Sequence, residues 1–150
     1  MKKFFVYILC LAPWFLSSFL KADYDYLTTI NTPFFTPPSW FYIVSWSLIY
    51  ILVSYSFYRI ITSYSFKNIP KSYKVTYLLN YLANQSFIPL FFILKNNFLG
   101  FISCLITLLT ILFLYSETKP LNKTAAKVLI PYILLAIFAT ILSLSIFLIN

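Results

Sequence analysis

Long apolar blocks separated by short polar breaks dominate the chain. Each block approaches the roughly 20 apolar residues that a helix needs to cross a bilayer, and the blocks cover residues 4–20, 40–61, 73–94, 98–115 and 125–149. The breaks contain charges or prolines, which end helices or are unfavourable in hydrocarbon. The pattern predicts an all-α integral membrane bundle of five transmembrane helices, forming a single domain over residues 1–150.

The composition agrees with a membrane protein. Of the 150 residues, 61% are hydrophobic, 22% are aromatic and only 9% are charged. A soluble domain of this size could not cover so much apolar surface with polar groups. The expected partner is therefore the lipid bilayer, which the chain crosses several times.

Basic residues are distributed unevenly among the predicted breaks. If the N-terminus is cytoplasmic, all of the 11 Lys and Arg residues fall on the cytoplasmic side except Lys21 and Lys95. This asymmetry follows the positive-inside rule, so we expect a cytoplasmic N-terminus. It also accounts for the net charge of +8 without a nucleic acid partner, which would need basic residues gathered on an exposed face.

The amino-acid usage gives an indication of the membrane in which the protein resides. Asn, Lys, Ile, Phe and Tyr are abundant, and their codons are rich in A and T. This favours the cell membrane of an AT-rich bacterium, with an organelle membrane as the alternative.

Residues 1–22 admit a second interpretation. A basic start, an apolar centre and Ala22 also resemble a secretory signal peptide. The apolar stretch is long for a signal, contains Pro13 and Trp14, and lacks a small-x-small cleavage site. Retention as the first helix is therefore favoured, and cleavage is the alternative.

Three predicted helices carry polar or aromatic stripes at helical spacing. The stripes comprise Tyr42, Trp46, Tyr50 and Ser54; Tyr73, Tyr77, Asn80, Asn84 and Phe87; and Ala136, Ala139, Ser143 and Phe147. Amides inside a membrane helix are costly unless they are satisfied, so Asn80, Asn84 and Gln85 should face the bundle interior. Asn84 either anchors a ligand or only ties helices together.

Other positions are expected to have structural roles. Trp14 and Trp40 lie near block ends, where an interfacial aromatic belt is expected, and Pro89 should kink the third helix. A stripe of small residues is expected to serve close helix packing; it consists of Gly100, Ser103, Thr107 and Thr110.

Catalytic chemistry finds little support in the sequence. The chain has no His, and its acidic residues are Asp23 and Asp25 in a loop and an isolated Glu117. These cannot assemble a general acid and base pair or a metal site. Enzyme activity is therefore not favoured, and we expect no catalytic or metal-binding residues.

Three ordered segments resemble the signature motifs of the TspO/MBR family, the tryptophan-rich sensory or translocator proteins, also known as peripheral benzodiazepine receptors. "TPFFTPPSWFYIVSWSLIY" is similar to the family's K-P-x-F-x-P-P-x-W-x-x-x-P-V-W-x-x-L-Y, with Trp40, Trp46 and Tyr50 in register. "NQSFIPLFF" resembles N-x-x-W-x-P-x-F-F, and residues 125–150 resemble the closing motif around Pro131 and Tyr132. The resemblance covers nearly all of the chain after the first helix and also implies five helices.

The resemblance implies a hydrophobic pocket among the helices, covered by the long first loop. Family members bind porphyrins and haem there, sterols in the animal forms, and synthetic isoquinoline-type drugs. We therefore expect the chain to bind a hydrophobic tetrapyrrole-like small molecule, porphyrin or haem, for transport or sensing, with no required cofactor. The predicted ligand-binding residues are Trp40, Trp46, Tyr50, Asn84, Phe87, Leu135, Ala139, Leu142 and Ser143.

Departures from the family pattern keep two alternatives open. Phe87, Leu135 and Phe147 stand where the family has tryptophan, and Ser143 replaces an asparagine, so stacking area and N–H donors are lost. One alternative is a partner-binding membrane regulator with a vestigial pocket. The other is a light-dependent porphyrin-degrading enzyme, which Leu135 disfavours. The resemblance also implies a homodimer built on small residues, although this chain has a single glycine.

Overall fold

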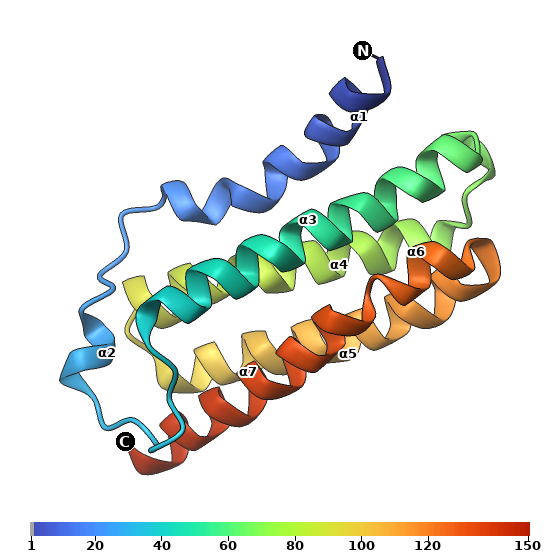
Figure 1. Ribbon diagram of the computed structural model, residues 1–150. Coiled ribbons are helices and arrows are strands. Elements are labelled where there is room, and N and C mark those ends of the chain that lie inside the picture. The colour runs from blue at the N-terminus through green and yellow to red at the C-terminus, as the bar shows by residue number, and fades with distance from the viewer. Residues whose placement is uncertain (1) are drawn as a thin grey trace.

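Five long helical segments lie side by side in the computed structural model, which describes residues 2–150 (Figure 1). They are α1 (Lys2–Leu11) with the 3-10 helix Ala12–Phe19; α3 (Ser39–Ser63); α4 (Lys71–Ile88) with the π-helical turn Pro89–Ile93; α5 (Asn97–Leu121); and α7 (Ile130–Ile149). The short elements between them are α2 (Tyr26–Thr29), the 3-10 turn Phe66–Asn68 and α6 (Lys123–Lys127). Over residues 2–150 there is no β-strand, so the predicted all-α class is confirmed.

The predicted number of membrane spans is confirmed only in part. Within the described residues, three helices are long and apolar enough to cross a membrane: Ser39–Ser63, Asn97–Leu121 and Lys123–Ile149. The apolar N-terminal helix Lys3–Phe19 is shorter. The α4 segment is less apolar because it carries Lys71, Lys74 and the amide side chains of its stripe.

Two predicted helix boundaries are wrong. The break expected at residues 116–123 lies later, because α5 continues through Pro120 to Leu121. A proline in the last turn removes only one of the final hydrogen bonds, so the helix tolerates it there. The chain breaks instead at Asn122, whose side chain accepts a 2.9 Å hydrogen bond from the Ala125 amide and caps α6. The last predicted helix is consequently divided, with Pro131 in the first turn of α7.

Prolines also change the helix type in two other segments. The first helix passes from α to 3-10 geometry at Ala12, directly before Pro13, which lacks an amide hydrogen. The predicted disturbance at Pro89 is present as a π-helical turn, in which the amide of Leu94 donates to the carbonyl of Pro89 at 2.9 Å. This turn places Phe91 in a buried cluster beside α7.

The small-residue stripe of α5 packs closely against α4, as predicted. A Cβ atom on Gly100 would lie 2.5 Å from Cδ2 of Phe91, so only glycine permits this approach. The Ser103 hydroxyl donates to the Ala83 carbonyl of α4 at 2.8 Å. Small side chains thus let the two backbones approach and bond.

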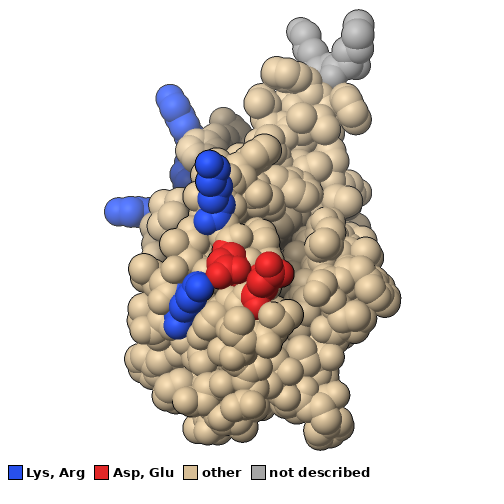
Figure 2. Space-filling view, turned by 90° about the vertical axis from the view of Figure 1, so that its left-hand side faces the viewer, with Lys and Arg blue, Asp and Glu red and all other residues tan. Residues whose placement is uncertain are grey.

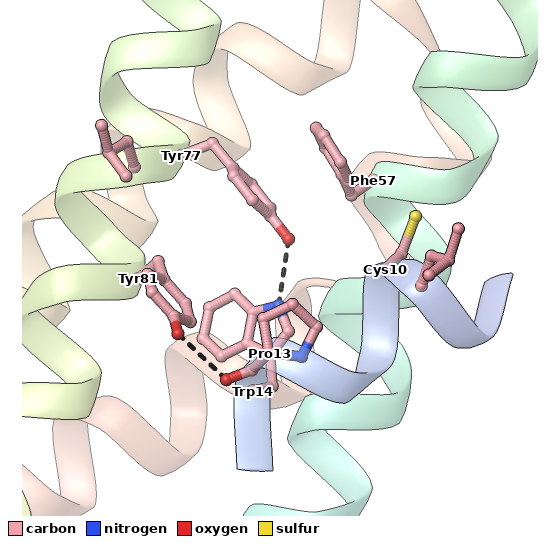
Figure 3. A pocket seen from close by; sticks show the side chains of 8 residues that line it. Cys10, Pro13, Trp14, Phe57, Tyr77 and Tyr81 are labelled. Carbon is pink, nitrogen blue, oxygen red and sulfur yellow. Dashed lines mark hydrogen bonds between the residues drawn. The ribbon is translucent and has the colours of Figure 1, made fainter. Parts of the chain in front are cut away.

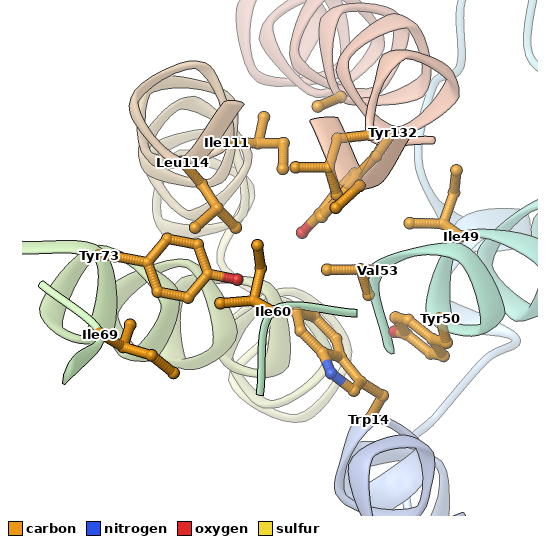
Figure 4. Close-up of a cluster of buried hydrophobic side chains, with 13 residues drawn as sticks. Trp14, Ile49, Tyr50, Val53, Ile60, Ile69, Tyr73, Ile111, Leu114 and Tyr132 are labelled. Carbon is orange, nitrogen blue, oxygen red and sulfur yellow. The ribbon is translucent and has the colours of Figure 1, made fainter. Parts of the chain in front are cut away.

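The bundle has a densely packed half and a half that contains a cavity. The packed half is the cluster around Ile60, Tyr73, Ile111 and Leu114, all of which are at most 1% exposed. Figure 4 shows these side chains converging from α3, α4 and α5. The cavity half lies toward the loop that connects the first helical segment to α3, residues 20–38, called the connecting loop below.

Candidate ligand-binding cavity

A cavity of about 600 Å³ lies between α3, α4, α5 and α7. Its lining extends along α3 from Ser39 to Tyr50, a span of about 16 Å at the helical rise. Small-molecule sites typically have volumes of about 300–1,000 Å³. None of the described residues that line it is Asp, Glu, Lys or Arg. The cavity therefore suits an apolar ligand whose buried part carries no charge.

Aromatic rings form much of the cavity wall. The Phe87 and Phe91 rings are stacked with centroids 5.2 Å apart, and Phe92 meets Phe87 edge-on at 6.0 Å. On the opposite helix, the Trp46 ring is tilted against Tyr50 with centroids 6.2 Å apart. Aromatic faces at these positions offer stacking surfaces to a planar ligand.

Asn84 links three helices at the inner end of the cavity, which is the end distant from the connecting loop. Its Oδ1 accepts hydrogen bonds from the Tyr50 hydroxyl at 3.1 Å and from Gln85 Nε2 at 3.4 Å. Its Nδ2 donates to the Tyr132 hydroxyl at 3.1 Å. Asn84 also lines the cavity. Asn84 therefore ties the helices together and also lies where a ligand anchor would be needed.

Trp14 fastens the first helical segment to α4 (Figure 3). Its Nε1 donates to the Tyr77 hydroxyl at 3.0 Å, and its carbonyl accepts from Gln85 Nε2 at 3.0 Å. The Gln85 Oε1 in turn accepts from the Ser17 amide at 2.9 Å. Trp14 is only 1% exposed, so its expected place in an interfacial aromatic belt is wrong. A second, smaller cavity of about 160 Å³ lies beside it.

The structure brings eight of the nine predicted ligand-binding residues to the cavity lining. They are Trp46, Tyr50, Asn84, Phe87, Leu135, Ala139, Leu142 and Ser143. Trp40 does not line the cavity and is 63% exposed. It precedes Trp46 by six residues, which corresponds to about 240° around a helix, so the two indoles occupy different faces of α3.

Sequence reasoning missed several lining residues. Phe91, Phe92 and Phe138 lie in segments that resemble family motifs, and this signal could have identified them. The small-residue stripe predicts only a packing role for Thr107. Others come from the first helical segment, the connecting loop and α5, where no predicted stripe contained them: Phe15, Ser18, Tyr24, Leu27 and Cys104. Further lining residues lie beside the predicted stripes of α3, α4 and α7: Ser39, Phe41, Ile43, Ser45, Ser47, Ile88 and Ile146.

Tyr24 and Leu27 bring the connecting loop over the cavity, and an ion pair fixes this part of the loop to the turn before α5. Lys95 Nζ lies 2.8 Å from Asp23 Oδ2. The hydrogen bond from Lys95 lowers the pKa of the Asp23 carboxyl below its ordinary value, and the same contact raises the pKa of Lys95. Figure 2 shows acidic and basic side chains side by side on this otherwise largely uncharged face.

Two further contacts hold the connecting loop. The Tyr26 hydroxyl lies 3.1 Å from the carbonyl of Lys95 and 2.9 Å from Asn97 Oδ1, and can donate to either. At the other end of the loop, the Asn31 amide donates to Asn150 Oδ1 and Asn150 Nδ2 donates to the Asn31 carbonyl, both at 2.9 Å. The loop is thus attached both to the start of α5 and to the end of α7.

Helices of membrane-spanning length around an uncharged, aromatic-lined cavity define a helical membrane protein with a small-molecule cavity. The chain matches the TspO/MBR family over residues 5–149 and belongs to that family, whose members are in general membrane sensory and transport proteins.

Named relatives agree with this assignment. The chain is 36% identical to tryptophan-rich protein TspO of Bacillus cereus, covering 97% of this chain and 94% of the relative. It is 31% identical to tryptophan-rich protein TspO of Archaeoglobus fulgidus, with 93% and 91% covered. The identity to the uncharacterized membrane protein YtaB of Bacillus subtilis is 30%, with 83% and 80% covered.

Proposed function

We propose that the protein binds a flat, hydrophobic, tetrapyrrole-like ligand such as porphyrin or haem in this cavity, and carries it across the bilayer or reports its presence. The observation that supports this most directly is a cavity of about 600 Å³ with aromatic walls and no charged residue within its described lining. The rings of Trp46 and Phe87 supply stacking surfaces, and Asn84 supplies a polar anchor at the inner end. Membership of the TspO/MBR family supports the same proposal.

The cavity also bears on the two alternatives. A vestigial pocket would be expected to be filled by side chains, whereas this one has the volume of a ligand site. Leu135 lines the cavity at a position where the resemblance implies a tryptophan. This substitution weighs against light-dependent porphyrin degradation.

The topology that we propose has five spans within one domain. The first helical segment and the α4 segment cross beside the three apolar spans, since both pack within the same bundle. The amides that lower the hydropathy of α4 are turned inward, with Asn80 fully buried. An N-terminus on the cytoplasmic side of a bacterial cell membrane follows from the positive-inside rule. A homodimer, if formed, cannot use Gly100, which is buried against Phe91.

The test is a titration of the detergent-purified protein with protoporphyrin IX, followed by porphyrin absorbance and tryptophan fluorescence. We expect saturable binding that is weaker in Trp46→Phe and Asn84→Ala. Trp40→Phe is the matched control, because Trp40 lies outside the lining, and it should bind like the wild type.

Other results would redirect the assignment. Absence of saturable binding to a folded wild-type sample would contradict the proposal. In that case, co-purification of a stable partner in mild detergent would support the regulator. Catalytic loss of porphyrin absorbance under illumination would instead indicate the degrading enzyme.

A further inference from the structure

Thr107 presents a hydroxyl group without a partner to the inner part of the cavity. The residue lies on α5, is 3% exposed and lines the cavity. Its carbonyl accepts hydrogen bonds from Asn80 Nδ2 at 3.2 Å and from the Thr110 hydroxyl at 3.1 Å. Its own hydroxyl makes no hydrogen bond to any residue in the range 2–150. This hydroxyl is not among the fully enclosed side-chain atoms that lack a partner, so it is open to the cavity that Thr107 lines. A polar group that enters the cavity can therefore pair with it.

The other buried threonines both have hydrogen-bonded hydroxyl groups, in contrast to Thr107. The Thr118 hydroxyl donates to the Leu114 carbonyl at 2.6 Å, and the Thr140 hydroxyl donates to the Ala136 carbonyl at 2.7 Å. Both satisfy their hydroxyls within their own helix, as threonines in helices commonly do. Only Thr107 among the three combines burial, cavity lining and a hydroxyl without a partner.

The electrostatics of the cavity orient a ligand that carries charge at one edge. The described lining contains no ionised side chain that could compensate a buried carboxylate, and an unpaired buried carboxylate is strongly unfavourable. Lys21 is exposed on the connecting loop, and Lys95 lies in the turn to which this loop is attached. The charged edge of a ligand therefore remains toward the loop, and the opposite edge faces Tyr50, Asn84 and Thr107.

Resting on the function proposed above, we propose that Thr107 determines which ligand edge is accepted at the inner end of the cavity. The preferred ligand is a flat ring system with carboxylates at one edge and an uncharged hydroxyl or carbonyl group at the opposite edge. That group pairs with the Thr107 hydroxyl. Among tetrapyrroles, this favours a hydroxyalkyl substituent over a vinyl group at the edge distant from the carboxylates.

The experiment compares two porphyrins that differ only at this edge. Haematoporphyrin IX has hydroxyethyl groups where protoporphyrin IX has vinyl groups, and both have the same ring and the same two propionates. The dissociation constants of both are measured for the wild type, Thr107→Val, Thr107→Ser and Thr140→Val. We expect Thr107→Val to shift the ratio of the two constants by about three- to tenfold against haematoporphyrin, as for one neutral hydrogen bond. Thr107→Ser should retain the wild-type ratio.

Stability provides the second readout and separates a ligand contact from a structural role. Thr107→Val should unfold at the same denaturant concentration as the wild type, because a methyl group replaces a hydroxyl that has no protein partner. Thr140→Val should be less stable but should leave the ratio unchanged. An unchanged ratio in Thr107→Val, or a loss of stability in that variant, would overturn this inference while the binding function stands. Failure of a folded wild type to bind either porphyrin would overturn both.

Discussion

The packed half and the cavity half of the bundle are built by the same helices, yet α4 behaves differently in each. Asn80 and Asn84 are one turn apart and both are buried. Asn80 donates to the carbonyl of Thr107 and to the Thr110 hydroxyl of α5, where small side chains let the helix approach. Asn84 faces tyrosines of α3 and α7 and borders open space. The function of an inward-facing amide thus depends on how closely the facing helix approaches.

The same difference should separate the stability effects of truncation in the two halves, and this is the largest effect we expect. Ile111 is 0% exposed within the packed half, so Ile111→Ala should lower the free energy of unfolding by about 2–5 kcal/mol by leaving a void. Leu135→Ala should cost clearly less, because Leu135 already borders a cavity. Denaturant unfolding in detergent measures both, and equal losses would contradict the division into two halves.

A smaller effect is expected within the cavity half, at Gly100 in the first turn of α5. The added Cβ of Gly100→Ala would meet the Phe91 ring at 2.5 Å, which should cost about 1–3 kcal/mol of unfolding free energy through overpacking. Phe91 lines the cavity, so its displacement should also weaken protoporphyrin IX binding. Combining the change with Phe91→Leu should restore part of the stability. A Gly100→Ala variant more stable than the wild type would show that Phe91 moves without cost.

The smallest effect is expected at the connecting loop. Asp23→Asn removes the exposed ion pair with Lys95 and should accelerate porphyrin dissociation by no more than a few-fold, since exposed ion pairs contribute little. Stopped-flow dissociation measures this rate. Asp25→Asn is the matched control, because it makes the same charge change at an exposed residue of the same loop that lies outside this ion pair. It should leave the rate unchanged.

The pH dependence of this rate tests the same contact. The pKa of Asp23 is lowered in the folded protein, so the contribution of the pair is present above the ordinary Asp pKa of about 3.9 and is lost as the pH falls through the lowered pKa. The pKa of Lys95 is raised, so the pair also persists up to the ordinary Lys pKa of about 10.4. The wild-type rate should therefore be flat between about pH 5 and pH 10. A steep rise near pH 7 would contradict this assignment.

Local periodicity predicted the side of α3 that faces the cavity. Tyr42, Trp46 and Tyr50 recur every four residues and all line it, whereas Ser54 at the same spacing donates to the carbonyl of Cys10 at 3.2 Å. The stripe therefore identified the inward face but could not show where the cavity ends. That limit depends on which helix lies opposite, and helix pairing is not encoded in the spacing within one helix.

Residues outside regular spacing were the hardest to predict. Tyr24 and Leu27 lie in a loop without periodicity, and only tertiary contacts bring them over the cavity. The spacing of small residues predicts that Thr107 packs against a neighbouring helix, and its carbonyl does accept a hydrogen bond from Asn80 of α4. The spacing does not predict that Thr107 also lines the cavity. The charges and Pro120 of residues 116–123 predict the end of α5 too early, because the structure accommodates Pro120 in the final turn of the helix.

The attachment of Trp14 and Ser17 to Gln85 has a consequence for how the protein assembles during synthesis. In the five-span topology proposed above, the first segment is synthesised before α4, so its Trp14 N–H at first has no Tyr77 hydroxyl to bond. The Gln85 amide then enters the bilayer as a polar group that needs partners. Unpaired groups of this kind are unfavourable in hydrocarbon. With the five spans proposed above, this part of the cavity wall is therefore completed only once α4 has inserted beside the first segment.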